Sequence, residues 1–327
     1  MNLPTYSLQE LSRRNGQTMA EIWVGYKGMI YDVTSSELFK DGKHYFHDTG
    51  KDLTFEMKDA PHLDDVMAKF PIVGKLAGSE QIENHFSNAN IHVETTPFIR
   101  LLERNKISAN TYHLTFQKPV GFHFSAGQYL KFHVSIGNVE HKRSYSICSA
   151  TNQSTIEFVV QLKNGGIVSE QLCLYAQIGD VIPISGPFGN FPIVESAQKE
   201  LFFICTDVGI GPIRSMLLEI SEKQMNFSKV HLIYGNRTKG DVLFENEWVK
   251  MQRTYPTFTY HSVFSRENFL LPFENAGYVH EVYTRLINDP KNCEFFVVGW
   301  DRMVHETKQN LLNLGANKDT IFVQLYI

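Results

Sequence analysis

The chain has 327 residues, of which 43% are hydrophobic and 20% are charged, and its formal net charge at neutral pH is -4. This length exceeds that of one ordinary hydrophobic core and predicts two or three domains. The slightly acidic balance provides no basic surface for DNA or RNA, which excludes nucleic-acid binding as a function class.

Residues 1–78 are predicted to form a small α+β domain. Residues 23–33 have the pattern of two strands, and the Lys27-Gly28 pair between them predicts a hairpin turn. The same region contains three nearby histidines, His44, His47 and His62. Ligation of haem iron by two imidazoles needs histidines on opposed elements with a fixed apolar surrounding, so these three are candidate iron ligands.

The rest of the chain divides by its pattern into three parts. Residues 79–96 are polar and predict a linker. Residues 97–195 contain β-branched and aromatic runs between glycine-containing turns, which predicts an antiparallel barrel. Residues 196–327 contain short apolar runs, most of them separated by stretches of helical length, which predicts a parallel sheet covered by helices on both faces.

One helix of the last part can be predicted from its apolar spacing. Ile213, Met216, Leu217 and Ile220 follow the i, i+3, i+4, i+7 pattern of a single helix face. It would cross over between the first two parallel strands.

Two motifs of the barrel have the chemistry that a flavin dinucleotide requires. Arg143-Ser144-Tyr145-Ser146 supplies a cation and an aromatic surface on one strand. About twenty residues later, Gly165-Gly166-Ile167-Val168-Ser169 precedes a helix-like segment, so backbone N–H groups and a serine would meet a phosphate at the positive end of a helix. Gly186-Pro187-Phe188-Gly189 then forms a rigid turn that closes the barrel.

Three motifs of the α/β part follow parallel strands. Val208-Gly209-Ile210-Gly211-Pro212 lies between the first strand and its helix, where a dinucleotide pyrophosphate binds. Tyr234-Gly235-Asn236-Arg237 ends the next strand, and Gly299-Trp300-Asp301-Arg302-Met303 follows a later one.

In this order, the motifs resemble those of the ferredoxin-NADP reductase family, which are R-x-Y-S, G-x-x-S, G-P-x-G and G-T-G-I-x-P. The resemblance implies FAD as cofactor and NADH or NADPH as reductant. It assigns Arg143 and Ser169 to the flavin pyrophosphate, Tyr145 to a ring face and Ser146 to the N5 region, with Tyr145 and Ser146 as the catalytic pair. The other cofactor-binding residues that it implies are Gly166, Val168, Gly209, Gly211, Pro212, Arg237, Gly299 and Met303.

The sequence departs from the family pattern at two places. Asp207-Val208 replaces the usual Gly-Thr pair, which puts a carboxylate near the expected phosphates unless it caps the following helix. Val298 replaces the usual cysteine beside the nicotinamide. Arg237 suits either a 2'-phosphate or a solvated loop, so the choice between NADH and NADPH stays open. Tyr326 suits either a ring over the flavin or core packing.

The N-terminal part resembles the cytochrome b5 fold, in its bacterial branch described as haem/steroid binding. The resemblance is carried by Trp23-Val24, by residues 31–34 and 50–54, and by Pro61-His62. It implies a b-type haem with His62, ten residues after Asp52, as one axial ligand. The H-P-G-G loop of the other ligand is absent, so His44 is the first candidate and His47 the alternative. Tyr45 as a ligand and a pocket without haem stay open.

Together these features predict a flavohaem oxidoreductase that passes electrons from NAD(P)H through FAD to haem and on to a redox protein or a small molecule. The alternative is a haem- or sterol-binding sensor, or a partner-docking module, whose reductase half is weakened at Asp207 and Val298. A third possibility is that the flavin reduces a diffusing acceptor directly. The physiological acceptor and the oligomeric state stay open.

The cysteines and the N-terminus suggest the compartment. The four cysteines are scattered singly and lack the close pairs of zinc or iron-sulfur sites, so they are interpreted as buried thiols in a reducing environment. The N-terminus lacks a basic and then apolar leader pattern, and no run approaches a membrane span. A cytoplasmic location is therefore expected. The four cysteines are Cys148, Cys173, Cys205 and Cys293.

Overall fold

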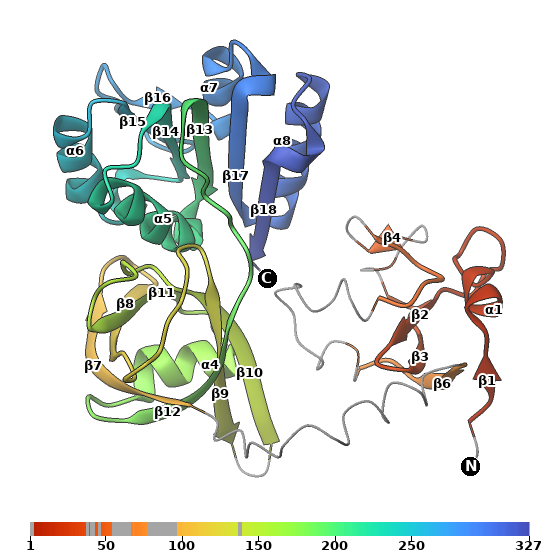
Figure 1. Ribbon diagram of the computed structural model, residues 1–327. Helices are drawn as coiled ribbons and strands as arrows, with labels where there is room; N and C mark the ends of the chain where they lie inside the picture. Colours follow the sequence, from red (N-terminus) through yellow and green to blue (C-terminus); the bar gives the residue numbers. More distant parts are fainter. Residues whose placement is uncertain are drawn as a thin grey trace. The chain divides into compact units, whose positions relative to one another are not determined.

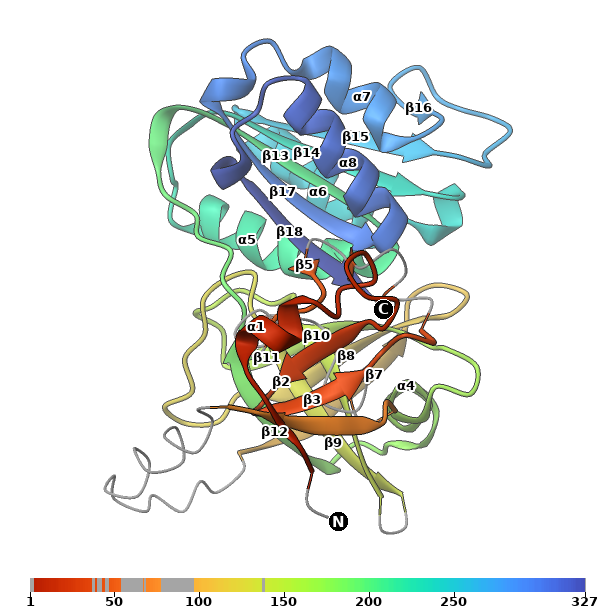
Figure 2. The ribbon, with the colours of Figure 1, turned by 90° about the vertical axis from the view of Figure 1, so that its right-hand side faces the viewer.

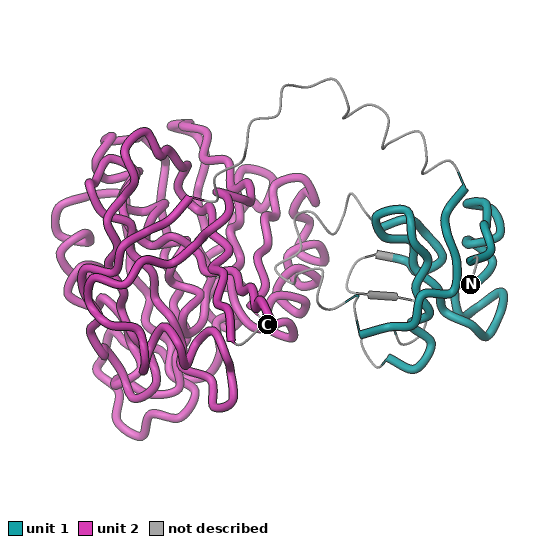
Figure 3. The backbone as a smooth tube through the Cα atoms, turned by 90° about the horizontal axis from the view of Figure 1, so that it is seen from below, with its two compact units in different colours: residues 1–95 teal, residues 96–327 magenta. Residues whose placement is uncertain are grey.

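The computed structural model describes residues 3–36, 39, 43–44, 47–53, 67, 69–77, 97–136 and 139–326. Figures 1 and 2 show the ribbon from two sides. The chain divides into two compact units, residues 1–95 and 96–327 (Figure 3). The predicted linker, residues 79–96, lies outside the described residues. None of the described helices is long and apolar enough to cross a membrane.

Unit 1 contains a four-stranded sheet in the order β1-β6-β3-β2, in which β1 is parallel to β6 and the other pairs are antiparallel. The predicted hairpin turn is confirmed, because Lys27 and Gly28 have φ angles of 49° and 76°, as two-residue hairpin turns require. The helix α1 begins with a capping box between Ser7 and Glu10. The elements are β1 (Thr5–Tyr6), α1 (Leu8–Ser12), β2 (Trp23–Tyr26), β3 (Met29–Asp32), β4 (Lys43–His44), β5 (His47–Asp48) and β6 (Ile72–Leu76).

The sheet of unit 1 is covered on both faces. Val24 and Tyr26 belong to one apolar cluster, and Trp23, which points to the opposite face, belongs to another. The first cluster extends to Phe39, Leu53 and Met67, and Phe70 packs edge-on against Phe39. The described part of unit 1 is therefore a small α+β core.

The first half of unit 2 is an antiparallel barrel. Its strands follow the order β10-β9-β12-β7-β8-β11, and a bridge between Ile147 and Phe158 joins the two ends of this sheet. Phe116, Phe132 and Phe158 pack edge to face in its centre. The elements are β7 (Phe98–Lys106), β8 (Thr111–Gln117), β9 (Tyr129–Ile136), β10 (Val139–Ser146), β11 (Thr155–Gln161), α4 (Ile167–Glu170), the π-helical turn η3 (Gln171–Tyr175) and β12 (Val181–Phe188).

The second half of unit 2 confirms the predicted parallel sheet. All pairs in the order β16-β15-β14-β13-β17-β18 are parallel. Helices α5 and α6 cover one face, and α7 and α8 cover the other (Figure 1). The elements are β13 (Ser196–Thr206), α5 (Ile210–Glu222), β14 (Phe227–Asn236), α6 (Glu245–Thr254), β15 (Phe258–Phe264), β16 (Asn275–Ala276), α7 (Val279–Leu286), β17 (Cys293–Trp300), α8 (Asp301–Asn313) and β18 (Ile321–Tyr326).

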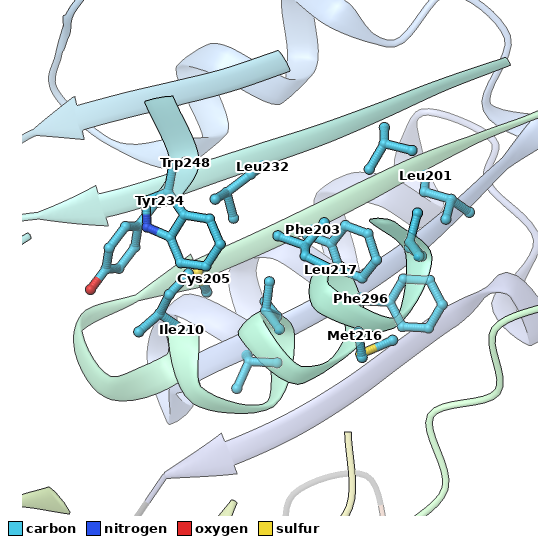
Figure 4. Packing of buried hydrophobic residues seen from close by; sticks show 14 of the residues in the cluster. Leu201, Phe203, Cys205, Ile210, Met216, Leu217, Leu232, Tyr234, Trp248 and Phe296 are labelled. Carbon is cyan, nitrogen blue, oxygen red and sulfur yellow. The ribbon is translucent and has the colours of Figure 1, made fainter. Parts of the chain in front are cut away.

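Helix α5 has the predicted buried face. Met216 and Leu217 pack with Phe203, Leu232 and Phe296 of the sheet (Figure 4). Each of the four residues of the predicted stripe is at most 1% exposed, so the spacing in the sequence identified the side that faces the core. They are Ile213, Met216, Leu217 and Ile220.

Two histidines lie together inside this α/β core. His231 on β14 stacks on Phe202 with ring centroids 4.7 Å apart, and its Nδ1 lies 3.4 Å from Nε2 of His261 on β15. Burial lowers the pKa of each histidine to about 4, with a smaller effect from Lys229 on His231 and from its histidine neighbour and Arg285 on His261.

Unit 2 is expected to lose stability as the pH falls. Unfolded histidine binds a proton near pH 6.5 and the folded pair only near pH 4, so between these values the unfolded chain holds more protons. The contribution of these histidines to the free energy of unfolding is fully present above about pH 6.5. It decreases toward pH 4, by on the order of 3 kcal/mol for one such histidine. Urea unfolding at pH values from 7.5 to 4.5 measures this change in the free energy of unfolding. In the His231→Gln, His261→Gln double variant, the free energy of unfolding should depend less on pH. Equal slopes for wild type and variant would contradict the assignment of this pH dependence to the two histidines.

Candidate functional site

The predicted flavin strand presents its motif on two faces. Strand alternation puts Arg143 and Tyr145 on one face of β10 and Ser144 and Ser146 on the other. The side chain of Arg143 is exposed, whereas Tyr145 packs edge-on against Phe132 at 5.5 Å, and burial raises its pKa. The hydroxyl of Ser144 is buried without a hydrogen-bond partner among the described residues. A cation, an aromatic ring and an unsatisfied hydroxyl therefore lie within three successive residues.

The predicted phosphate turn lies beside this strand, because α4 packs against β10 and β9. Gly165 has a φ of 73°, which a side chain would strain, and Gly166 is the N-cap of α4. The hydroxyl of Ser169 donates to the carbonyl of Gly166 at 2.9 Å and accepts from the N–H of Lys163 at 3.2 Å. Val168 is buried in the barrel core. In this structure Ser169 thus holds the turn together, and Val168 has only its backbone to offer a ligand.

The glycines of the second turn are required by packing. A Cβ on Gly209 would lie 2.6 Å from the carbonyl oxygen of Val298, and one on Gly211 would lie 3.1 Å from Cγ2 of Val159 in the barrel. Pro212 is buried in the first turn of α5, where its missing N–H costs nothing. No side chain caps the N-terminus of α5, and the N–H of Ile210 donates to the carbonyls of Asp207 and Val208 in the turn before it.

Asp207 does not cap this helix, so the alternative in which its carboxylate serves as the helix cap is wrong. Its carboxylate Oδ2 accepts a hydrogen bond of 2.9 Å from the indole N–H of Trp300, and its carbonyl accepts one of 2.9 Å from the hydroxyl of Tyr234. Its φ of 48° is left-handed, a conformation that costs most side chains roughly 1 kcal/mol and glycine almost nothing. A glycine at this position would suit that backbone.

A cavity of about 460 Å³ opens at the carboxyl ends of β13, β14 and β17, next to this turn. Both amide atoms of Asn236 and the hydroxyl of Thr206 are buried in its lining without partners among the described residues. Since buried polar groups are nearly always satisfied in folded proteins, these atoms fit a polar ligand such as a dinucleotide. The lining also includes Asp207, Arg237, Ser265, Tyr278, His280, Trp300, Arg302, Met303 and Glu306.

The cavity thus brings together predicted residues from distant strands. Arg237 and Met303 both line it, and Gly299 lies beneath, where a Cβ would be 2.7 Å from the hydroxyl of Thr206. Both guanidiniums are exposed, and that of Arg302 is also paired with Glu306 at 2.7 Å, whereas Arg237 has no ion pair among the described residues. Arg237 is therefore the more available of the two cations for a ligand.

The last strand joins the two halves of unit 2. Gln324 donates from Nε2 to the hydroxyl of Ser146 at 2.8 Å, and the hydroxyl of Tyr326 donates to the carbonyl of Val208 at 3.0 Å. Tyr326 also packs against the core of α5, in agreement with the core-packing alternative for it. Gln324 was not identified from the sequence, because a single glutamine in a strand gives no signal of its own.

The candidate iron ligands are described only in part. His44 and His47 are Cα partners in the short β4–β5 pair, where the structure describes their backbone alone. His62 lies outside the described residues.

Comparisons with known proteins agree with this geometry. Residues 98–193 match the family model for the oxidoreductase FAD-binding domain, and residues 203–309 match that for the oxidoreductase NAD-binding domain. The reductase component of propane 2-monooxygenase from Rhodococcus jostii is 33% identical over 213 residues, which are 63% of this chain and 56% of that protein. The electron transfer component of anthranilate 1,2-dioxygenase from Acinetobacter baylyi is 26% identical over 186 residues, 57% of this chain and 53% of that protein.

The chain therefore spans little more than half the length of either relative. A crystal structure of a ferredoxin NADP+ reductase from Neisseria gonorrhoeae with bound FAD and NADP superposes with a TM-score of 0.63 at 22% identity, over 70% of this chain and 98% of that one. The predicted fold of the barrel and the α/β part is thereby confirmed.

Substitution of Gly209 tests the packing of the turn. Gly209→Ala forces a methyl group against a backbone oxygen and should destabilise unit 2 by about 2 kcal/mol or more. Gly240→Ala is the matched control, because its nearest neighbour would be 3.8 Å away, and it should change stability by less than about 0.5 kcal/mol. Urea unfolding followed by intrinsic fluorescence measures the free energy of unfolding of both variants. Equal effects would show that the contact with Val298 is not what requires glycine at position 209.

Proposed function

Because residues 98–193 and 203–309 are the FAD-binding and NAD-binding domains of an oxidoreductase of the ferredoxin-NADP reductase family, we propose that the chain oxidises NADH or NADPH with FAD and passes electrons to a one-electron acceptor. The observation that carries this proposal is the cavity with unsatisfied Asn236 and Thr206 beside Asp207, in the turn that precedes α5. Bound FAD would supply the conversion between a two-electron donor and single-electron acceptors.

The barrel residues would hold the flavin. Arg143, with the backbone N–H group of Val168, suits the pyrophosphate, because a guanidinium and a helix start both favour anions. Gly166 would shape the turn, since its own N–H donates to the carbonyl of Lys163. Tyr145 would contact a ring face. Ser146 would act near the reacting nitrogen, with its hydroxyl held by Gln324. Ser169 contributes through the loop that it closes.

The α/β residues would hold the nicotinamide dinucleotide. Gly209, Gly211 and Pro212 form the turn that would lie against its pyrophosphate. Arg237 would face the ribose, where it suits a 2'-phosphate. The remaining contacts, beside the nicotinamide, are assigned to Gly299 and Met303.

The acceptor is proposed to be a redox protein or a small molecule. Two relatives are named as the reductase component of a monooxygenase and the electron transfer component of a dioxygenase, which favours an oxygenase-like partner.

The proposed domains are residues 1–78, 97–195 and 196–327, with 79–96 as the linker. The proposed location is the cytoplasm, in agreement with four buried, free cysteines.

For the N-terminal domain we infer a cytochrome b5-like pocket for haem b, with His62 and His44 as iron ligands and His47 as the alternative to His44. The support is the sequence resemblance, together with an apolar cluster on a small α+β sheet. Electrons would then leave the flavin through this haem.

The second candidate is a haem- or sterol-binding sensor or docking module with a weakened reductase half. The observation that favours it is Asp207, whose carboxylate lines the nucleotide cavity. A negative charge beside a pyrophosphate lowers its affinity.

Replacement of Asp207 decides between these two candidates. Asp207→Gly removes the charge and suits the left-handed backbone, so the Michaelis constant for the preferred nucleotide should fall about fivefold, as expected for roughly 1 kcal/mol of lost repulsion. Asp207→Asn, which keeps an acceptor for Trp300, should also lower it. Steady-state ferricyanide reduction measures the effect. No improvement, with FAD still bound, would favour the sensor.

The haem proposal is tested by an anaerobic optical titration of the reconstituted protein. NADH or NADPH should bleach the flavin and then reduce the haem, which is seen in the Soret and alpha bands. His44→Ala and His62→Ala should lose the low-spin spectrum, while His47→Ala keeps it. A haem that stays oxidised with both nucleotides in excess would contradict the relay.

A further inference from the structure

A buried guanidinium connects the barrel to the α/β domain. Arg214 on α5 is 8% exposed, and its Nε and Nη2 donate to the two carboxylate oxygens of Glu247 on α6 at 2.8 and 2.9 Å. Its Nη1 lies 2.7 Å from Oε2 of Glu157 and 2.9 Å from the carbonyl oxygen of Cys148, both in the barrel. One side chain thus makes a bidentate pair within its own domain and two further bonds across to the other.

The surroundings of Arg214 keep these charges in place. Its guanidinium lies over the ring of Phe244 at 4.4 Å, and Nε2 of His113 lies 3.2 Å from the carboxylate of Glu157. Burial opposes ionisation of Glu157, but the hydrogen bonds from His113 and Arg214 outweigh it and lower its pKa to about 2. The carboxylate is therefore charged throughout the physiological range.

The same cluster holds a potential set of metal ligands, but the arginine already provides its cation. Ligand atoms of His113, Cys148 and Glu157 lie within 4.8 Å of one another. Nη1 of Arg214 is bonded to this group, and burial raises the pKa of the Cys148 thiol to about 12, so the thiol stays protonated. The interaction is a bridge between domains rather than a metal site.

The position of Arg214 connects it to both proposed cofactor sites. It follows Pro212 of the nucleotide turn by two residues, and Cys148 follows Ser146 of the flavin strand by two. Between these segments Gly211 is in close contact with Val159 on β11, the strand that carries Glu157. A shift of α5 relative to Glu157 would therefore move the nucleotide turn relative to the flavin strand.

We propose that Arg214, anchored by Glu157, is a positioning residue that sets the separation between the nicotinamide and flavin sites. The inference rests on the proposed function. Transfer between two bound groups depends steeply on their distance, so misplacement lowers the rate of the reaction while each group still binds its own domain. Arginine is needed, because its planar fork bonds both domains at once and lysine cannot.

The test is anaerobic stopped-flow reduction of the bound flavin, with the rate at saturating nucleotide and the nucleotide Kd measured separately. Glu157→Gln should lower the saturating rate about tenfold or more and leave the Kd within about twofold. Glu294→Gln is the matched control. Glu294 is also buried and paired with a cation, Lys199, but both lie inside the α/β domain, so the rate should not change.

Arg214→Lys and Arg214→Met complete the comparison. Lysine keeps the charge and should recover part of the rate that methionine loses. If Glu157→Gln does not retain FAD, Arg214→Lys provides the same rate and Kd comparison. Equal rates for wild type and variants, or a rate loss matched by an equal loss of affinity, would overturn the positioning role. A wild-type flavin that neither nucleotide reduces would instead contradict the proposed function.

Discussion

Unit 2 depends on the burial of one positive charge between two folded halves. Arg214 is removed from water, so each of its charged bonds has to be made, and the two carboxylates that make them come from different domains. A structure in which the barrel and the α/β domain moved apart would leave Glu157 with His113 alone and Nη1 of Arg214 without its two partners in the barrel. The same interface between the two halves is also bridged by Gln324 of the last strand, which donates to the hydroxyl of Ser146 in the barrel.

Elements with local signals could be predicted from the sequence. The stripe of Ile213, Met216, Leu217 and Ile220 identified α5, and Lys27-Gly28 identified a turn that needs two positive φ angles. The alternation of apolar runs with helical stretches predicted the parallel sheet, because each buried strand must be continuously apolar. The helix stripe and the turn each act over fewer than ten residues, and each apolar run is also short, so neighbouring residues are enough to reveal them.

The roles of the site residues were harder to predict from the sequence, because these roles come from contacts between distant parts of the chain. The pair of Arg214 and Glu157 spans 57 residues and that of Ser146 and Gln324 spans 178. The sequence located Arg143, Ser169 and Arg237 by motif, but it did not show that the Ser169 hydroxyl closes its own loop or that Asp207 binds Trp300. Those outcomes depend on backbone conformation and on which partner lies nearest in space.

In the proposed function, one compact unit brings a nicotinamide to a flavin across the interface between its two halves. The most direct measurement is the anaerobic rate of flavin reduction with NADH or NADPH that carries deuterium at the transferred position of C4. We expect one of them to bleach the flavin, and to do so more slowly when deuterated, because the bond to that hydrogen breaks in the measured step. A bound flavin that stays oxidised with both nucleotides would contradict it.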